Sequence, residues 1–145
     1  MNVKALLAAK ILGGNVISIE PTATLSAAAK LLSKHRIGVV VILGAGGRLA
    51  GILSERDIVR AVAEQGAAAL GVTVGQAMTR NVTTCTAEDD IAAIMERMTV
   101  GKFRHMPVMA NGLPVGLVSI GDVVKHRVGE IERVSEAMRD YIRSA

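Results

Sequence analysis

A short polar motif occurs twice in this sequence, each time where an apolar run gives way to a helical pattern. The motif Gly-x-x-Ser-x-x-Asp stands at residues 51–57 and again, 65 residues later, at 116–122. The carboxylates of Asp57 and Asp122 can each accept two hydrogen bonds from neighbouring hydroxyls in a fixed geometry. A helix that begins at the serine presents N–H groups and a partial positive charge, which suit a phosphate. Both motifs are therefore candidate binding sites.

The same motif has a second interpretation as a helix cap. A serine followed three residues later by an acidic residue can satisfy the first backbone N–H groups of a helix while binding nothing else. Such a cap contributes about 0.5–2 kcal/mol. The residues of one copy leave the two interpretations open. Two copies at matching places favour ligand binding in at least one of them.

The motifs belong to a longer internal repeat. Val16 matches Val82 at a spacing of 66 residues, and Asp57 matches Asp122 at a spacing of 65. Each repeat predicts a β-α-β-β-α unit, in which Thr24 or Asp90 caps the first helix and Ser54 or Ser119 begins the second. Gly and Asn between the paired strands supply the positive φ of a hairpin turn. The predicted strands are Val16–Ile19, Val39–Leu43 and Leu49–Leu53, then Val82–Cys85, Met106–Met109 and Pro114–Val118.

Each unit is too small to bury its own sheet well, so we expect the two to pack sheet against sheet. The fold class is α+β, with the repeats related by a pseudo-two-fold axis and a long C-terminal helix. The expected divisions are 1–64 (first repeat with an N-terminal helix), 65–80 (a linker with a short helix near Thr73 to Met78), 81–128 (second repeat) and 129–145 (helical extension).

The motifs at 51–57 and 116–122, with Phe103-Arg104-His105-Met106-Pro107-Val108, resemble those of the CBS-domain family over roughly residues 2–128. The resemblance implies a disc-like Bateman module with two clefts between the repeats. Each cleft can hold the adenosine part of AMP, ADP, ATP, S-adenosylmethionine or NAD. The aspartate of each motif would hold the ribose, while the serine and its helix N-terminus would face ribose or phosphate.

The resemblance also implies that the two clefts differ. In the family, a cleft takes its aspartate from one repeat and its basic residues from the central strand of the other. Asp57 would then share a cleft with Arg104 and His105, next to Arg56. Asp122 would face Gly38 and Val39, and Val41 stands where the second repeat has Pro107. The full set of expected ligand-binding residues is Ile17, Gly38, Val39, Ser54, Arg56, Asp57, Thr83, Arg104, His105, Met106, Pro107, Ser119 and Asp122.

Composition excludes several other classes of protein. The chain is 50% hydrophobic and its only aromatic residues are Phe103 and Tyr141, so adenine would lie in an aliphatic slot. The three histidines lie in dissimilar contexts and Cys85 stands alone, so we expect no metal, no required cofactor and no catalysis. No run of eighteen apolar residues occurs, which argues against a membrane span and fits a cytoplasmic protein. A net charge of +4 raises nucleic acid as a partner, but the basic residues are scattered among acids.

The helical pattern continues from Ser119 toward Ser144, beyond what a repeat requires. Val124, Val128, Ile131, Val134, Met138 and Tyr141 form an apolar stripe at spacings of three and four. The stripe could pack on its own module or form a dimer seam, and we favour a homodimer. The sequence thus predicts a stand-alone regulatory sensor that acts on a separate, unidentified protein. The alternatives are a structural or partner-docking CBS pair, or a weak nucleic-acid binder.

Overall fold

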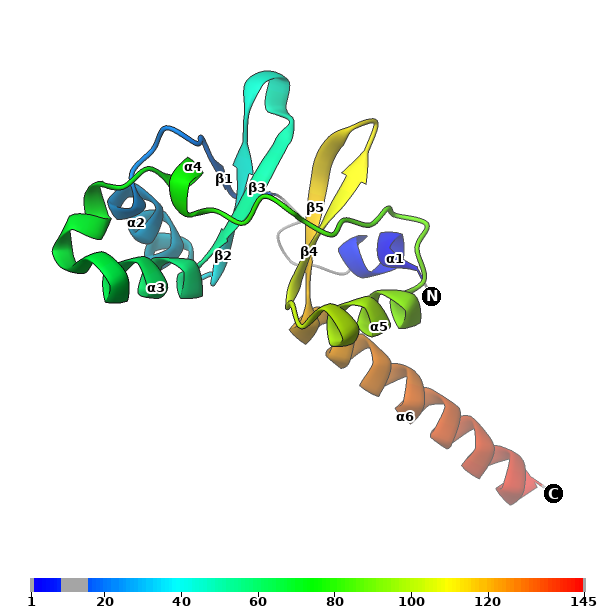
Figure 1. Ribbon diagram of the computed structural model, residues 1–145. Helices are drawn as coiled ribbons and strands as arrows, with labels where there is room; N and C mark the ends of the chain where they lie inside the picture. Colours follow the sequence, from blue (N-terminus) through cyan, green and yellow to red (C-terminus); the bar gives the residue numbers. More distant parts are fainter. Residues whose placement is uncertain (1, 9–15, 145) are drawn as a thin grey trace.

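The structure is a computed structural model that describes residues 2–8 and 16–144. Its helices and strands follow the predicted order twice (Figure 1). The helices are α1 (Val3–Ala8), α2 (Leu25–His35), α3 (Glu55–Gln65), α4 (Val74–Ala77), α5 (Ile91–Gly101) and α6 (Ile120–Ser144), with short 3-10 helices η1 (Ala45–Gly47) and η2 (Gly66–Gly71). The strands are β1 (Ser18–Ile19), β2 (Val39–Leu43), β3 (Leu49–Ser54), β4 (His105–Ala110) and β5 (Leu113–Ser119).

The first repeat holds a three-stranded sheet and the second a two-stranded one. Strand β1 pairs parallel to β2, and β2 pairs antiparallel to β3. Strands β4 and β5 form the matching antiparallel pair. Both hairpins carry a register shift at the same place, between Ile42 and Leu43 and between Val108 and Met109, 66 residues apart. The shared irregularity supports the internal repeat down to the level of single residues.

The first strand of each repeat is shorter than predicted. Strand β1 begins at Ser18 rather than Val16, and the strand predicted at 82–85 is reduced to one parallel bridge between Cys85 and Val108. The reason lies in β4: the Val41 amide donates to the Ile17 carbonyl at 3.1 Å in the first repeat, whereas Pro107 at the same place has no amide hydrogen to donate to Thr83. A parallel edge strand pairs on one side only, so few bonds hold it in register.

The predicted turns and caps are mostly confirmed. Asn111 and Gly112 have φ of 53° and 78°, as a two-residue hairpin turn requires. The Thr24 hydroxyl accepts a hydrogen bond from the Ala27 amide at 3.1 Å. Asp90 occupies the matching N-cap position of α5 without a side-chain capping bond. Helix α4, with Thr73 as its cap, lies where the linker helix was expected.

Each repeat has its own helix-on-sheet core, and the short helices are exchanged between them. Val3 and Leu6 of α1 belong to the core of the second repeat, whereas Val74 of α4 belongs to that of the first. Helices α1 and α4 dock on their cores in equivalent ways. Asn2, just before α1, forms a β-bridge to Asp90, and Thr73, just before α4, forms a β-bridge to Thr24. Helix α1 precedes the first repeat in sequence but completes the core of the second.

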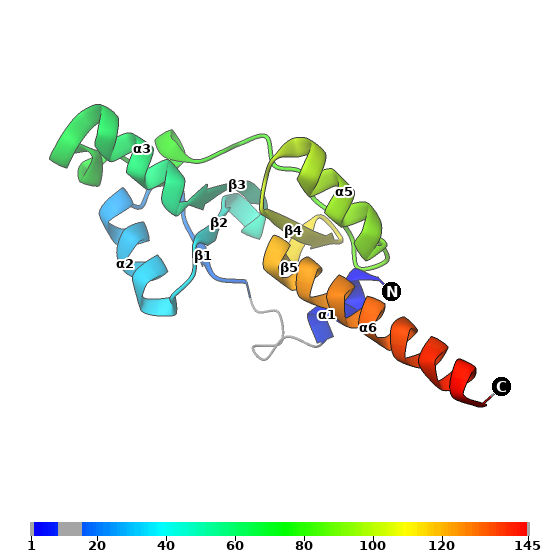
Figure 2. The same ribbon diagram turned by 90° about the horizontal axis from the view of Figure 1, so that it is seen from below.

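The two repeats pack through their sheets, as expected. Val40 and Ile42 of β2 belong to the core of the first repeat. Val39 and Val41 alternate with them and therefore point to the opposite face of the sheet, where they are also buried but belong to neither core. Pro107 is buried between two core residues of β4 in the same way. Figures 1 and 2 show the β2–β3 hairpin beside the β4–β5 hairpin in both views.

Helix α6 runs to Ser144, as the periodicity predicted. Val123 is its only buried residue within the described chain, and the apolar stripe from Val124 to Tyr141 is exposed. The outer half of α6 projects away from the rest of the molecule (Figure 2). The module itself therefore does not cover the stripe. Among the described residues, no helix has both the length and the apolar character that crossing a membrane requires.

Candidate functional site

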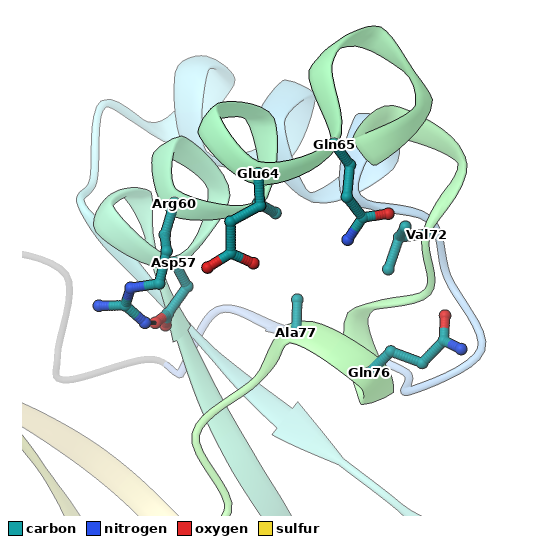
Figure 3. A pocket seen from close by; sticks show the side chains of 8 residues that line it. Asp57, Arg60, Glu64, Gln65, Val72, Gln76 and Ala77 are labelled. Atoms are coloured by element: carbon teal, nitrogen blue, oxygen red, sulfur yellow. Dashed lines mark hydrogen bonds and ion pairs between the residues drawn. The ribbon is translucent and has the colours of Figure 1, made fainter.

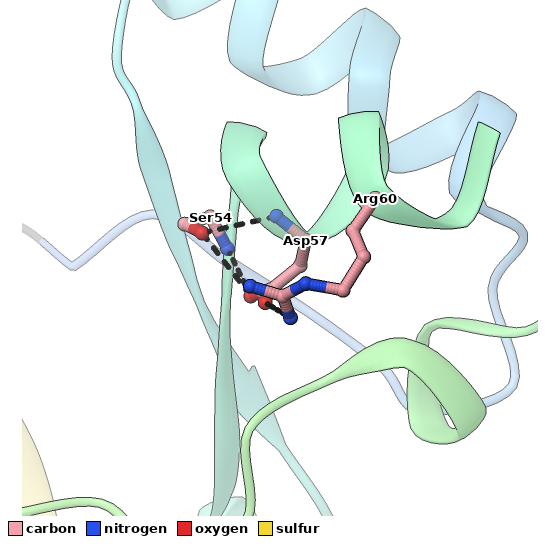
Figure 4. A network of polar contacts seen from close by, with 3 residues as sticks. All are labelled: Ser54, Asp57 and Arg60. Atoms are coloured by element: carbon pink, nitrogen blue, oxygen red, sulfur yellow. Dashed lines mark hydrogen bonds and ion pairs between the residues drawn. The ribbon is translucent and has the colours of Figure 1, made fainter. Parts of the chain in front are cut away.

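The first motif is an ordered cap at the start of α3. The Asp57 carboxylate accepts hydrogen bonds from the backbone amide of Ser54 at 2.9 Å and from its hydroxyl at 3.2 Å (Figure 4). The Ser54 hydroxyl in turn accepts from the Asp57 amide at 3.3 Å. Sequence dictates this geometry, because an extended residue at the N-cap brings the side chain of the third helical residue back over it.

The second oxygen of Asp57 is held more loosely. It lies 3.3 Å from the Arg60 guanidinium, which is 67% exposed, whereas Asp57 itself is only 8% exposed. An ion pair to so exposed a partner contributes little in water. A carboxylate offers about four lone-pair positions, so hydroxyls of a ligand could join or displace Arg60 without breaking the cap. Asp57 is thus placed to bind as well as to cap.

The second motif forms the same cap at the start of α6. The Ser119 amide donates to the Asp122 carboxylate at 3.1 Å, and the Asp122 amide donates to the Ser119 hydroxyl at 3.1 Å. The capping interpretation therefore holds for both copies. In both copies the cap fixes the orientation of the carboxylate at the helix N-terminus.

The strand register places Arg104 and His105 at the second motif. His105 pairs with Ser119 across β4 and β5, and the Ile120 amide donates to the Arg104 carbonyl at 2.7 Å. These contacts associate the basic pair with Asp122 of its own repeat. We expected it to serve Asp57 instead, and that pairing across the repeats stays a prediction.

The corresponding place in the first repeat carries an acid rather than a base. Val39 pairs with Ser54, and the Glu55 amide donates to the Gly38 carbonyl at 2.9 Å. A Cβ added at Gly38 would lie 3.7 Å from the Glu55 carboxylate, so that side chain lies against the glycine. Ile120 stands at the place of Glu55 in the second repeat. The residues beside the start of α6 are therefore basic where those beside the start of α3 include an acid.

A polar pocket of about 300 Å³ opens beside the first motif (Figure 3). It lies between α3 and the linker that carries η2 and α4, and its lining is Asp57, Arg60, Ala61, Glu64, Gln65, Val72, Gln76 and Ala77. Sequence reasoning included only Asp57 of these residues. The Thr73-x-x-Gln76 capping box marked the linker helix, but nothing in the sequence says that α4 docks against α3.

The remaining expected residues differ in what they can offer a ligand. Met106 is fully buried in the core of the second repeat, and Val39 and Pro107 are buried between the sheets. Ile17 is half-buried, and its carbonyl accepts from the Val41 amide at 3.1 Å. The side chains of Arg56, Thr83 and Arg104 are exposed.

Burial changes the chemistry of Cys85. It is 3% exposed, and desolvation, with the nearby negative charge of Asp89, raises the pKa of its thiol to about 11. Such a thiol is a poor nucleophile at neutral pH. Within residues 2–8 and 16–144, no group of three or more His, Cys, Asp or Glu side chains could hold a metal ion.

Comparisons with solved structures find several similar tandem modules. A CBS-domain containing protein from Agrobacterium tumefaciens is 48% identical, with a TM-score of 0.82 over 87% of this chain and 92% of that one. A CBS domain protein from Pyrobaculum aerophilum, solved in complex with AMP, is 30% identical, with a TM-score of 0.74 over 84% and 89%. A CBS domain pair solved with 5′-methylthioadenosine and S-adenosyl-L-methionine is 27% identical, with a TM-score of 0.78 over 90% and 98%.

Comparison with sequence families gives the same result. The chain spans 58% of the length of a mitochondrial CBS-domain protein from Arabidopsis thaliana, to which it is 35% identical over 119 residues. The CBS domain matches twice, at residues 8–64 and at 74–129, once on each repeat. This chain therefore belongs to the CBS-domain family, as a tandem pair of CBS repeats.

Proposed function

We propose that this chain is a regulatory module that binds an adenosine-containing ligand, rather than an enzyme. The observation that carries the proposal is the pair of helix caps, each of which fixes a carboxylate at a helix N-terminus. Two similar modules were solved with adenosyl ligands, one with AMP and the other without a phosphate on its ligands. What those ligands share is adenosine, whose ribose hydroxyls suit a carboxylate.

We propose further that the two motifs serve different parts of the ligand class. The start of α6 combines the Asp122 cap with Arg104 and His105, so it favours a phosphorylated ligand such as AMP, ADP or ATP. The start of α3 has Glu55 against Gly38 instead, and a carboxylate there disfavours phosphate. This end suits an uncharged or cationic adenosyl group, as in S-adenosylmethionine.

The test is a calorimetric titration of the full chain with AMP, ADP, ATP, S-adenosylmethionine and NAD. We expect micromolar binding of at least one of them. Mass spectrometry of the small molecules released on denaturation would identify a ligand that copurifies. A matched variant, Asp57→Asn with Asp122→Asn, keeps side-chain size but removes both charges, and it should lose the binding. No heat and no thermal shift with any of the five compounds would overturn the proposal.

A structural or partner-docking module is the second candidate, and one observation favours it. Both carboxylates are already engaged as caps, which is all that a purely structural motif needs. This candidate predicts empty clefts and a tight protein complex. A weak nucleic-acid binder, suggested by the net charge of +4, predicts instead a steep loss of affinity with salt.

We also propose a cytoplasmic location and a homodimer. A single buried cysteine outside any disulfide fits a reducing compartment. Cell fractionation with an antibody against the chain tests the location. Affinity capture in the presence and absence of the adenosyl ligand tests which protein the module regulates.

A further inference from the structure

The outer half of α6 presents an apolar face that the chain itself leaves uncovered. From residue 131 to 144 every side chain is exposed except the half-exposed Ser135. Exposure of the large apolar side chains rises from 40% at Val124 to 69% at Ile142. An isolated helix of about this length is marginal in water, because most helical stability comes from packing of an amphipathic face. A continuous helix here therefore calls for a covering partner.

The spacing on this face is that of a coiled coil. Residues 124, 128, 131, 135, 138 and 142 alternate steps of four and three, which is the heptad repeat of a two-stranded seam. We call this set the α6 seam: Val124, Val128, Ile131, Ser135, Met138 and Ile142. Ser135 is its single polar member, and one polar residue in a seam helps to specify register. Val134 and Tyr141 widen the apolar face along one edge.

We propose that a second copy of this chain covers the α6 seam, in a parallel two-stranded coil. The charges beside the seam carry this choice. In a parallel pair, Arg127 faces Glu132 of the second copy, and the symmetry repeats this attraction on the other side. A fully overlapped antiparallel pair would set Glu132 against Glu132 and Lys125 against Arg139. Arg127 is already oriented by a 2.9 Å ion pair with Glu130 on its own helix.

The charges also argue against a membrane surface as the occupant. Between residues 132 and 143 three acidic side chains and three arginines cancel, so the polar face carries no net charge. Helices that lie on anionic membranes carry a basic polar face. The pairing of Arg127 with Glu132 needs only a second identical chain.

Light scattering of the full chain tests the association. Ile131→Glu places a charge in the α6 seam, and Arg133→Gln lowers the net charge equally on the polar face. We expect the wild type and Arg133→Gln to be dimers at tens of micromolar. Ile131→Glu should raise the dissociation constant at least tenfold, and its monomer should lose helix content by circular dichroism, because the outer half of α6 is then uncovered.

Cysteine cross-linking tests the orientation. Met138→Cys lies in the seam and should form an intermolecular disulfide under mild oxidation, whereas Glu136→Cys on the outer face should not. Native Cys85 interferes little, because it is buried and the pKa of its thiol is raised to about 11. Charge reversal gives a second readout: Arg127→Glu and Glu132→Arg should each weaken the dimer, and the double variant should recover part of the loss.

Three outcomes would overturn the proposal. The first is a monomeric wild type at tens of micromolar, whether or not it binds vesicles of anionic lipid or another protein. The second is a dimer that Ile131→Glu does not weaken, because it must then form through another surface. The third is cross-linking through Glu136→Cys in place of Met138→Cys. None of these measurements depends on an adenosyl ligand, so they remain separate from the test of ligand binding.

Discussion

Arg104 and Gly38 occupy the same place in the two repeats, one residue before the central strand. The difference matters because the Arg104 carbonyl accepts the first amide of α6, which holds the backbone of Arg104 next to the Asp122 cap while its side chain is exposed. An arginine fork suits phosphate better than any other side chain does. The physical difference between the two ends of the module therefore rests on a few side chains.

Arg104→Ala should weaken AMP binding roughly tenfold or more, because a hydrogen bond to a charged group contributes about 1.5–3 kcal/mol. Adenosine lacks the phosphate, so its affinity should barely change. Paired calorimetric titrations of the two ligands measure the difference. Equal losses for AMP and adenosine would mean that Arg104 does not contact phosphate.

The same variant decides which carboxylate shares the ligand with Arg104. In an Asp122→Ala background, Arg104→Ala should have little further effect on AMP affinity, because the ligand has already lost its place at that end. In an Asp57→Ala background the full loss should persist. The reverse result would support the pairing across the repeats that the family resemblance implied.

Thr24→Ala should destabilise the module by about 1 kcal/mol, because the hydroxyl caps α2 through the Ala27 amide. Thr22→Ala, in the exposed turn just before it, is the matched control and should change stability little. Urea denaturation measures both. A control that costs as much as Thr24→Ala would show that the loss does not come from the cap.

At the scale of elements, Gly51 and Gly116 stand at equivalent places in the two repeats, and each lets another segment approach its strand closely. A Cβ at Gly51 would lie 2.5 Å from the Thr79 carbonyl oxygen, which is backbone of the linker that follows α4. A Cβ at Gly116 would meet the end of the Leu7 side chain at 2.9 Å. Backbone cannot move aside cheaply, whereas a leucine can change rotamer.

Gly51→Ala should therefore destabilise the chain more than Gly116→Ala. The expected loss of stability in Gly51→Ala is about 2 kcal/mol, which is typical of overpacking. Gly71→Ala, with nothing within 4 Å of the added Cβ, is the control for the change in backbone entropy. Thermal unfolding of the three variants gives the order. Equal costs at Gly51 and Gly116 would show that the linker yields as readily as Leu7.

At the scale of the whole molecule, Cys85 should make the stability of the folded chain fall at alkaline pH. Burial raises the pKa of its thiol from 9.0 to about 11 in the folded chain, so the neutral form is favoured there. The unfolded chain releases the proton from about pH 9 upward, and the folded chain only near 11. The stabilising contribution is complete below pH 9 and is lost as pH rises through the folded pKa.

Urea denaturation at pH 8 and at pH 10.5 should show this loss, on the order of 2 kcal/mol, in the wild type. Cys85→Ala lowers stability at both pH values through lost packing, but it should remove the alkaline component. All other ionisable side chains are the same in both proteins, so their contributions cancel in the comparison. An identical decline with pH in the two proteins would contradict the assignment to Cys85.

Much of the fold follows from local signals along the chain. Turn residues predicted the Asn111-Gly112 turn, a cap residue predicted the start of α2 at Thr24, and the apolar stripe predicted the length of α6, because each depends on residues close in sequence. The Ser-x-x-Asp motifs predicted capped helix starts for the same reason. The strand predicted at 82–85 is reduced to one bridge at Cys85, because Pro107 has no amide hydrogen where Val41 of the first repeat donates to the facing strand.

The arrangement around the candidate site was decided by tertiary structure alone. Nothing in the sequence shows that α1 completes the second core, that α4 docks on the first, or that the pocket beside Asp57 includes Glu64 and Gln76. The pairing of His105 with Ser119, by contrast, is set within one hairpin by its turn and its register shift. Residue types determined which chemistry is possible here, and contacts between distant segments determined which of those residues meet.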